Sequence, residues 1–318
     1  MSTTTMAPAL RATGLRKSFG DTVALDGIDL NVAQGSVFAL LGPNGAGKTT
    51  TVQILSTLIP PDAGEVRVAG HDPARDPQAV RAAIGVTGQF SAVDNLLTGE
   101  ENLALMADLR HLDREEGRRR ADELLERLDL VDERRKPAAT YSGGLRRRLD
   151  LAMTLMGEPR IIFLDEPTTG LDPRSRRAVW RIVRGLVERG VTIFLTTHYL
   201  EEADELADRV ALLDHGKLIA EGTPDELKRR VPGGHVLLEF ADPAALEEAA
   251  RAFPEWTRDD AAMTLAVPGD GAVGSLRELL DVLDRASVSV ARLTVHTPDL
   301  DDVFLALTGR ADHEGDLR

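Results

Sequence analysis

Short, continuously apolar runs that alternate with helical stretches are the feature that most limits how this chain can fold. Runs such as SVFALLG, RIIFLD, VTIFLTTH and VALLDHG are separated by helical stretches such as KTTTVQILSTL and RSRRAVWRIVRGLVE. Strands without polar alternation are buried on both faces, as in a parallel sheet that is covered by its crossover helices. We therefore expect an α/β domain built on a parallel core sheet.

Two other patterns accompany this core. The stretches ALRATGLRKSF, VALDGIDLNVA and GEVRVAG predict short alternating strands, which would form a small antiparallel sheet beside the core. Residues 93–157 change to helical patterns, with ENLALMADLR and the highly charged EEGRRRADELLERLDL. We interpret this segment as a helical insertion within a first domain that spans residues 8–228.

The basic, Pro/Gly-containing stretch KRRVPGG, Lys228 to Gly234, is typical of a linker. Beyond it the expected elements run strand, helix, strand, strand, helix and strand, from HVLLEF to VSVARLTVH. This order is that of a ferredoxin-like sandwich. Residues 235–310 are therefore expected to form a small α+β domain.

The composition excludes several functional classes. The 318-residue chain has a net charge of −14, which argues against a nucleic-acid partner bound by phosphate neutralisation. The basic runs at 118–120, 146–148, 174–177 and 228–230 have acidic neighbours or lie on expected helices, so we expect solvated faces there. The absence of cysteine excludes disulfides and thiolate chemistry and fits a reducing cytoplasm. Because the apolar runs are far below the roughly 18 residues of a membrane span, a membrane role requires a partner.

The segment GPNGAGKT, Gly42 to Thr49, lies between an expected buried strand and an expected helix. Glycines allow successive amides to wrap around phosphates, because a Cβ would obstruct the close approach. Lys48 offers a positive charge and Thr49 a hydroxyl ligand for Mg²⁺. An ordinary glycine-rich turn is the alternative, which the lysine, the threonine and the flanking elements disfavour. The expected nucleotide-binding residues here are Gly42, Pro43, Asn44, Gly45, Ala46, Gly47, Lys48, Thr49 and Thr50.

Candidate catalytic side chains follow other apolar runs. Asp165 and Glu166 end the strand in RIIFLDEP, where one carboxylate can hold Mg²⁺ and the other can activate water. His198 follows VTIFLTT and could contact a γ-phosphate, and Gln89 follows IGVTG and could sense Mg²⁺ and phosphate. Each has a structural alternative when it is taken alone: a solvated acidic pair, a capping histidine and a loop amide.

The stretch YSGGLRRRLD, Tyr141 to Asp150, predicts a helix that starts with exposed amides at Ser142, Gly143 and Gly144. The dipoles of a helix N-terminus favour negative charge. This stretch is therefore a second candidate anion site, distant in sequence from the phosphate loop.

The order of GPNGAGKTT, Gln89, YSGGLRRR, IIFLDEP, TGLDP and His198 closely resembles that of the ATP-binding cassette (ABC) ATPases, across roughly Leu10 to Leu227. The Ser-Gly-Gly helix between the two Walker motifs separates that family from other P-loop enzymes. The resemblance implies the family's P-loop fold, with ATP and Mg²⁺ as ligands. It implies catalytic roles for Glu166 as general base and for His198, Gln89 and Lys48, and Mg²⁺ contacts for Thr49, Gln89 and Asp165.

Further implications of the resemblance concern partners. Phe19 resembles the aromatic residue that stacks on adenine, and Asp172 belongs to the loop that links two active sites. Ser142, Gly143 and Gly144 are expected to contact the ATP held by a partner cassette, in a homodimer or with a homologous chain. A separately encoded polytopic permease would place the pair at the cytoplasmic face of the cell membrane.

The stretches YSGGLRRRLDLA, TTGLDPRSRRAVW and PDLDDVFLALTG are similar to those of ATP-binding subunits of daunorubicin-resistance-type drug exporters. This implies export of a hydrophobic drug or natural product. The chain departs from the family at Phe19, where tyrosine is commoner, and at Leu145, where glutamine is usual. Leu145 is in line with the apolar stripe of its helix and is interpreted as the start of it. A soluble cassette acting on nucleic acid or ribosomes and a regulatory cassette without turnover are the alternatives.

Overall fold

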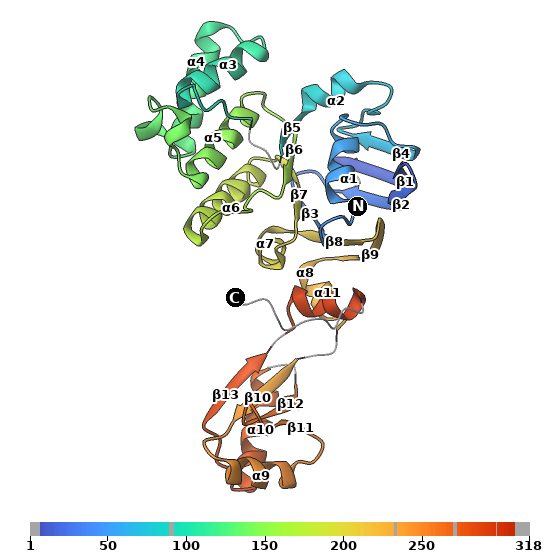
Figure 1. The fold of residues 1–318 in the computed structure, drawn as a ribbon, viewed down its shortest axis with the longest axis vertical. Helices are drawn as coiled ribbons and strands as arrows, with labels where there is room; N and C mark the ends of the chain where they lie inside the picture. The colour runs from blue at the N-terminus through green and yellow to red at the C-terminus, as the bar shows by residue number, and fades with distance from the viewer. Residues whose placement is uncertain (1–6, 89–91, 232–233, 270–271, 297, 309–318) are drawn as a thin grey trace, which may run out of the picture. The chain divides into compact units, whose positions relative to one another are not determined.

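The computed structural model of the protein describes residues 7–88, 92–231, 234–269, 272–296 and 298–308. The chain divides into two compact units, Met1–Pro224 and Asp225–Arg318, each of which has its own sheet or sheets (Figure 1). No helix formed by these described residues is both long and apolar enough to cross a bilayer.

The first unit is built on a six-stranded sheet with the strand order β5-β6-β7-β3-β8-β9. Its neighbouring strands are parallel except β8 and β9, which are antiparallel. Every residue of β3, β6 and β7 is buried, which explains their continuous apolar sequences. The expected parallel core is therefore confirmed, and the edge strand β9 is an addition to it. The strands are β3 (Val37–Leu41), β5 (Ile84–Thr87), β6 (Ile161–Asp165), β7 (Thr192–Thr197), β8 (Arg209–Asp214) and β9 (Lys217–Gly222).

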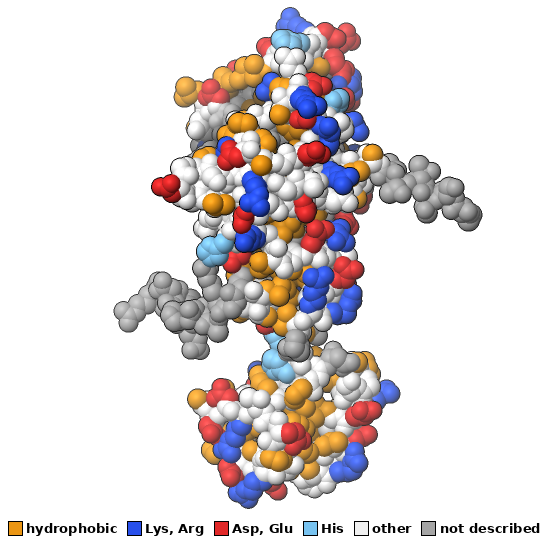
Figure 2. Space-filling model, turned by 90° about the vertical axis from the view of Figure 1, so that its right-hand side faces the viewer, with side chains coloured by type: hydrophobic (Ala, Val, Ile, Leu, Met, Phe, Trp, Pro, Cys, Tyr) orange, Lys and Arg blue, Asp and Glu red, His pale blue; other side chains and the backbone are white. Residues whose placement is uncertain are grey.

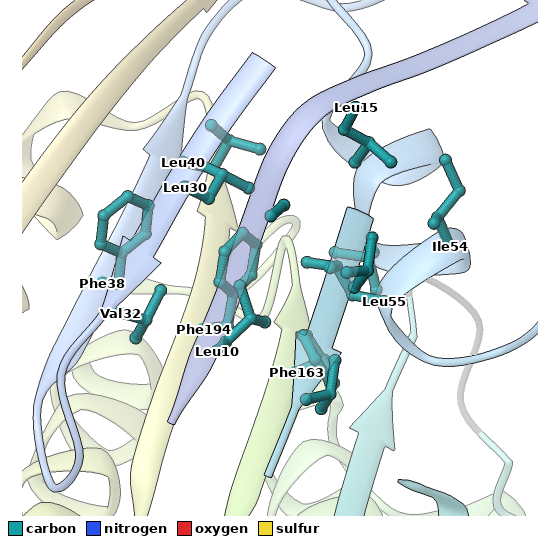
Figure 3. Close-up of a cluster of buried hydrophobic side chains, with 14 of the residues drawn as sticks. Leu10, Leu15, Leu30, Val32, Phe38, Leu40, Ile54, Leu55, Phe163 and Phe194 are labelled. Atoms are coloured by element: carbon teal, nitrogen blue, oxygen red, sulfur yellow. The ribbon is translucent and has the colours of Figure 1, made fainter. Parts of the chain in front are cut away.

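The expected antiparallel sheet packs beside this core. Its strand order is β2-β1-β4, and its inward side chains meet α1 and the core sheet in one apolar cluster (Figure 3). Within the cluster the rings of Phe38 and Phe194 stack with their centroids 5.6 Å apart, and Phe163 lies equally close to Phe194. Burial of each such side chain contributes about 1.5–3 kcal/mol. The elements are β1 (Leu10–Phe19), β2 (Thr22–Val32), β4 (Ala63–Val68) and α1 (Lys48–Leu55).

Helices cover the remaining surface of the core sheet, and α6 lies on the opposite side of it from α1 (Figure 1). A helical segment is inserted between β5 and β6, as the change of pattern predicts. Its helices begin with polar caps: Thr98 forms a capping box with Glu101, and Asp113 accepts from two amides of its helix. The helices are α2 (Pro77–Ala83), α3 (Gly99–Leu109), α4 (Arg114–Arg127), α5 (Gly143–Leu155), α6 (Pro173–Val187) and α7 (Leu200–Leu206), with single 3₁₀ turns at Val131–Glu133 and Ala138–Thr140.

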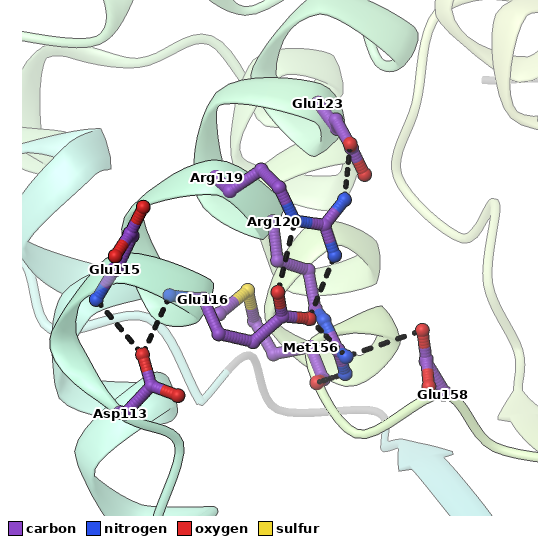
Figure 4. Close-up of polar contacts among 8 residues, drawn as sticks. All are labelled: Asp113, Glu115, Glu116, Arg119, Arg120, Glu123, Met156 and Glu158. Atoms are coloured by element: carbon purple, nitrogen blue, oxygen red, sulfur yellow. Dashed lines mark hydrogen bonds and ion pairs between the residues drawn. The ribbon is translucent and has the colours of Figure 1, made fainter.

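The arginine run at 118–120 is not a uniformly solvated face. Arg119 is half exposed, but Arg120 is largely buried and donates to the Met156 carbonyl at 2.8 Å (Figure 4). Hydrogen bonds from Arg119 and Arg120 lower the pKa of the Glu116 carboxyl to about 2. The expectation for this run is therefore wrong at Arg120, which ties α4 to the end of α5.

The face of the molecule shown in Figure 2 carries basic and acidic side chains that are interspersed. Among the ion pairs at the surface of the first unit, Arg67 pairs with Asp72 at 2.7 Å and Arg209 pairs with Glu221 at 2.9 Å. Exposed pairs of this kind contribute little to stability but keep a surface solvated and free of a single-sign field.

The second unit begins with the short helix α8 and contains a four-stranded antiparallel sheet in the order β11-β12-β10-β13. Helices α9 and α10 connect the strands in the element order of the ferredoxin-like motif. Leu238, Leu246, Leu265 and Leu283 are among the buried residues of its separate core. The elements are α8 (Pro224–Lys228), β10 (His235–Glu239), α9 (Pro243–Ala252), β11 (Thr257–Asp259), β12 (Thr264–Pro268), α10 (Val273–Arg285), β13 (Arg292–His296) and α11 (Leu300–Thr308).

Candidate active site

The loop between β3 and α1 is shaped for close backbone approach. Gly45 and Gly47 have φ angles of 82° and 111°, in the left-handed region that glycine adopts without strain. A Cβ on Gly42 would meet the Leu213 carbonyl oxygen at 2.1 Å, and one on Gly47 would meet the Ala24 carbonyl oxygen at 2.5 Å. The loop is therefore pressed against β2 and β8, so sterics require glycine at positions 42 and 47, and backbone conformation requires it at positions 45 and 47.

The same loop meets the requirements of a phosphate site. The first amide groups of α1 have no carbonyl partner within their own helix, so they can bind an anion. A Cβ on Gly45 would point into open space, so the path to the loop backbone is clear. The residues present thus fit a nucleotide phosphate group.

Lys48 lies inside this loop and is almost fully buried. Its Nζ donates to the carbonyl oxygens of Gly42 at 2.7 Å and Pro43 at 3.1 Å, and lies 3.6 Å from a carboxylate oxygen of Glu166. Burial lowers the pKa of the Lys48 ammonium, and the Glu166 carboxylate opposes that shift. The contacts hold a positive charge at the start of α1, where phosphate charge would be neutralised.

Asp165, the last residue of β6, faces the start of α1. The Thr49 hydroxyl lies 3.5 Å from Asp165 Oδ1, and the Thr196 hydroxyl donates to the same oxygen. The pairing of β6 with β7 places Asp165 directly opposite Thr196, which fixes this contact. A hydroxyl and a carboxylate supply the oxygen ligands that Mg²⁺ prefers, and Mg²⁺ commonly takes only one or two protein carboxylates besides phosphate.

Glu166 follows Asp165 in an unusual conformation. Its φ of 49° is in the left-handed region, which a non-glycine residue adopts at a cost of about 1–3 kcal/mol. Its amide donates to the Thr196 carbonyl at 3.0 Å, and one of its carboxylate oxygens lies 3.3 Å from His198 Nδ1. The strand pairing thus turns the carboxylate toward Lys48 and His198, in one cluster with the phosphate loop.

A second cluster forms where α5 meets α6. Ser142 caps α5, and its hydroxyl accepts from the Leu145 amide at 3.3 Å. A Cβ on Gly144 would lie 2.4 Å from the Ser175 hydroxyl oxygen, so only glycine allows this close approach. Asp172 caps α6 and accepts a 2.5 Å hydrogen bond from that same Ser175 hydroxyl, which lowers the pKa of the Asp172 carboxyl.

Ser142, Leu145 and Asp172 also line a groove of about 750 Å³ between the helices, which includes none of the phosphate-loop residues. Leu145 is only half buried there, whereas Leu149 and Met153 are buried, so Leu145 does not begin the buried stripe of α5. Among the described residues, the Ser142 hydroxyl bonds within its own helix, and the groove that it lines includes none of residues 42–49. The two clusters are therefore separate within one chain.

Two expected site residues, Phe19 and Gln89, belong to neither of these clusters. Phe19 ends β1 with 51% of its surface exposed, and the Lys17 ammonium lies 5.5 Å from its ring centre. The ring is thus available for stacking. Gln89 lies outside the described residues.

Three polar residues that organise these clusters were not predicted from the sequence. Thr196 lies two residues before the expected His198, and its position opposite Asp165 could have indicated its role. Arg147 was expected in a solvated run but is buried, and its guanidinium donates to the Pro167 carbonyl at 2.8 Å. Glu202 is fully buried and accepts from the Thr168 hydroxyl at 2.9 Å and the Trp180 indole at 3.0 Å.

Glu202→Gln is expected to raise the unfolding temperature, with a gain that increases with pH. Burial raises the pKa of the Glu202 carboxyl above 4.5, although its hydrogen bonds oppose the shift. The contribution of this group to stability is therefore complete below pH 4.5 and is lost as pH rises through the folded-state pKa. Glutamine keeps the acceptor for Thr168 and Trp180 but cannot ionise. Thermal unfolding followed by circular dichroism across this range measures the difference.

The neighbouring substitution Glu201→Gln is a matched control, because Glu201 is exposed and pairs with Arg176 at 3.2 Å. It should give no gain that grows with pH. An equal change for both variants, or a gain that is the same at all pH values, would contradict the prediction.

Comparison with known proteins decides the family. The family model described as ABC transporter matches residues 25–169. The Daunorubicin resistance ATP-binding protein DrrA3 of Streptomyces coeruleorubidus is 49% identical over 95% of this chain and 96% of its own length. The chain belongs to the ABC transporter family. The expectation of an ATP-binding and ATP-hydrolysing transporter subunit is confirmed.

Other relatives extend the comparison. The Daunorubicin/doxorubicin resistance ATP-binding protein DrrA of Streptomyces peucetius is 47% identical over 95% of this chain and 92% of its own length. The Nod factor export ATP-binding protein I of Paraburkholderia xenovorans is 37% identical over 93% of this chain and 95% of its own length. The similarity to these ATP-binding proteins thus extends through most of the second unit.

Solved structures support the same fold. A structure of the ATP-binding subunit of an ABC transporter aligns with 70% of this chain and 92% of its own length, at 29% identity and a TM-score of 0.63. A dimeric cassette in a post-hydrolysis state, bound to ADP and Pi, aligns with 67% of this chain and 98% of its own length, at 28% identity and a TM-score of 0.61. The expected P-loop cassette fold is confirmed, and members of this family dimerise and work with a separate membrane permease.

Proposed function

We propose that two copies of this chain bind two ATP molecules between them and drive a separately encoded polytopic permease in an exporter. The observation that carries the proposal is the separation of the two half-sites: Lys48 and Glu166 lie in one cluster and Ser142 in another. The free amides at the start of α5 have a use if they meet phosphate held by a second cassette. A head-to-tail pair with twofold symmetry completes both sites at once.

Each copy would hold its own nucleotide through the phosphate loop. The amides of the loop and the Lys48 ammonium bind the β- and γ-phosphates, and the half-exposed Phe19 ring stacks on adenine. From the opposite copy, the Ser142 hydroxyl and the amides of Gly143 and Gly144 contact the γ-phosphate. Asp172, at the start of α6, belongs to the loop that runs between the two sites.

The hydrolytic step falls to side chains at the ends of β6 and β7. When bound, Mg²⁺ neutralises phosphate charge, with the Thr49 hydroxyl and the Asp165 carboxylate as its ligands. Glu166 accepts a proton from the attacking water, because its strained backbone and its contacts hold the carboxylate beside Lys48. His198, whose ring lies beside that carboxylate, orients it and donates to the γ-phosphate. We retain Gln89 as a Mg²⁺ ligand and sensor on its family position alone.

The proposed cargo is a drug or natural product of hydrophobic character. The names of the relatives, which refer to daunorubicin resistance, doxorubicin resistance and Nod factor export, support an exporter of small natural products. The interspersed charges on the face in Figure 2 favour a solvated subunit over one that coats nucleic acid. We place the subunit at the cytoplasmic face of the cell membrane, held there by its permease.

A reconstituted transport assay tests this function. The chain is expected to co-purify with a separately encoded polytopic membrane protein and, in proteoliposomes, to move daunorubicin only with ATP and Mg²⁺. The Lys48→Ala variant in the same complex should bind the permease but transport nothing, because it lacks the phosphate-binding charge. Sedimentation of the chain with ribosomes or DNA, and never with membranes, would overturn the proposal.

A further inference from the structure

Arg147 connects parts of the chain that belong to different half-sites. It lies on α5, the helix that Ser142 caps, and only 9% of it is exposed. Its Nε donates to the Pro167 carbonyl at 2.8 Å, directly after Glu166 in the chain. Its Nη1 donates to the Gly88 carbonyl at 3.1 Å, at the end of β5. One guanidinium therefore bridges α5, the end of β6 next to Glu166, and Gly88 at the end of β5.

Asp150 completes this bridge from the same helix. Its carboxylate lies 3.2 Å from Arg147 Nη1 and also accepts from the Ala92 amide at 3.2 Å. The pair thus holds Gly88 and Ala92, on either side of the segment that contains Gln89. Burial lowers the pKa of the Arg147 guanidinium and raises that of the Asp150 carboxyl, and the attraction between the two groups opposes both shifts.

A second contact couples the same elements. Gly144 approaches Ser175 so closely that no side chain fits between them, and Ser175 hydrogen-bonds Asp172 at 2.5 Å. The segment from Asp165 to Ser175 therefore touches α5 at both ends, through Arg147 near Glu166 and through Gly144 near Asp172. A shift of α5 cannot leave this segment in place.

A buried charge pair adds little to the net free energy of unfolding. Desolvation of the two charges offsets most of their attraction, and apolar residues of similar volume often replace such pairs without loss. A forked guanidinium can, however, bind several carbonyl groups in fixed directions. The contacts of Arg147 are thus better explained by positioning than by packing.

We propose that Arg147 is a positioning residue that couples the two ATP sites of the dimer. The inference rests on the proposed function, in which Glu166 serves the nucleotide of its own chain and Ser142 serves that of the partner. Because Arg147 joins both parts inside one chain, closure of Ser142 on one nucleotide sets the position of Glu166 at the other. Without Arg147, each site binds ATP but no longer responds to its neighbour.

The test compares Arg147→Met with the double variant Arg147→Met/Asp150→Leu in the full chain. The single variant leaves Asp150 buried without its partner and should unfold at a lower temperature. The double variant removes both charges and should recover much of that loss. For both, the ATPase rate kcat should fall about 10-fold or more, because the backbone at Gly88 and the segment that carries Glu166 lose a contact that positions them.

Cooperativity is the readout that a purely structural residue would not change. We expect the Hill coefficient for MgATP hydrolysis to fall from nearly 2, its limit for paired sites, toward about 1 in both variants. ATP affinity, titrated by calorimetry without Mg²⁺ so that no turnover occurs, should stay within about twofold, since the phosphate loop is unchanged.

Arg148→Met is the matched control. Arg148 is the next residue of α5, and its guanidinium donates to the carbonyls of Leu128 and Asp129 inside the helical insertion. It should keep both kcat and the Hill coefficient. Equal losses in Arg148→Met, or a stable double variant with wild-type kcat and cooperativity, would overturn the inference.

The two proposals fail differently. A wild-type protein that hydrolyses ATP with a Hill coefficient of about 1 refutes coupling through Arg147. It leaves the proposed ATPase function unaffected. Absence of hydrolysis and transport by wild type refutes the proposed function itself.

Discussion

Glu166→Gln should lower Mg²⁺-dependent ATP hydrolysis by at least about 100-fold while ATP binding persists. The Glu166 carboxylate lies 3.6 Å from Lys48 Nζ and 3.3 Å from His198 Nδ1, so it faces the phosphate loop. Glutamine has the same shape and can keep the strained backbone position, but its amide does not accept a proton from water. The variant therefore removes the general base and leaves the backbone conformation in place. Phosphate release under saturating MgATP measures the loss.

The same variant should accumulate as an ATP-bound dimer. Removal of a carboxylate beside the γ-phosphate position lessens repulsion in the closed pair, and hydrolysis no longer reopens it. Size-exclusion chromatography with ATP should show a dimer for Glu166→Gln and mainly monomer for wild type. Because the Glu166 carboxylate supports the charge of Lys48, its removal lowers the Lys48 pKa further, and the assay belongs near neutral pH.

Glu201→Gln provides the control for this experiment, since it makes the same chemical change on the exposed side of α7. It should hydrolyse ATP at the wild-type rate. A Glu166→Gln variant that keeps more than about a tenth of wild-type turnover would assign the base to another group. A wild type without turnover even in the presence of its permease would make the chain a regulatory cassette.

The elements that sequence predicts well are those whose residues are determined locally. Strands β3, β6 and β7 are buried on both faces, so their continuous apolar runs specify a parallel core. The phosphate loop is equally readable, because Gly45 and Gly47 need left-handed φ angles that other residues avoid. Local pattern and tertiary structure agree at these positions.

The residues that sequence predicts poorly are those whose role depends on tertiary neighbours. The arginines at 146–148 look alike in a helical run, yet only Arg147 is buried and meets the carbonyls of Pro167 and Gly88. The sequence predicts an anion-binding role for Gly144, but glycine is also required there because any side chain would collide with Ser175. Strand β9 escapes detection because it lies at the sheet edge, where KLIAEG mixes buried and exposed residues. None of these contacts produces a periodic pattern of residue types in the sequence.

Two variants that are inactive alone should regain hydrolysis when they are combined. Ser142→Asp keeps a capping oxygen for the Leu145 amide, so α5 still forms, but it places a carboxylate where phosphate would bind. Glu166→Gln leaves Ser142 intact and removes the base. Each homodimer then has two defective sites, because every site lacks either the Ser142 hydroxyl or the Glu166 carboxylate.

A mixed dimer of these variants contains one intact site. It combines Glu166 from the Ser142→Asp chain with Ser142 from the Glu166→Gln chain, and the other site carries both defects. Random pairing makes half of the dimers mixed, so hydrolysis should return to about a quarter of the wild-type rate if the intact site works alone. A smaller return is expected to the extent that the two sites depend on each other through Arg147.

The control combines Ser142→Asp with a chain that carries both substitutions, since no arrangement of these chains contains an intact site. Two affinity tags, one on each chain, verify that mixed dimers form and allow their isolation. Recovery in the first mixture and not in the second requires that Ser142 and Glu166 act from different chains. Mixed dimers that form, retain no tightly bound ATP and stay inactive would show that the two clusters serve a nucleotide within one chain, or that α5 binds no nucleotide at all. The separation of Ser142 from the phosphate loop in this structure favours recovery, because Ser142 caps α5 and the groove that it lines includes no phosphate-loop residue.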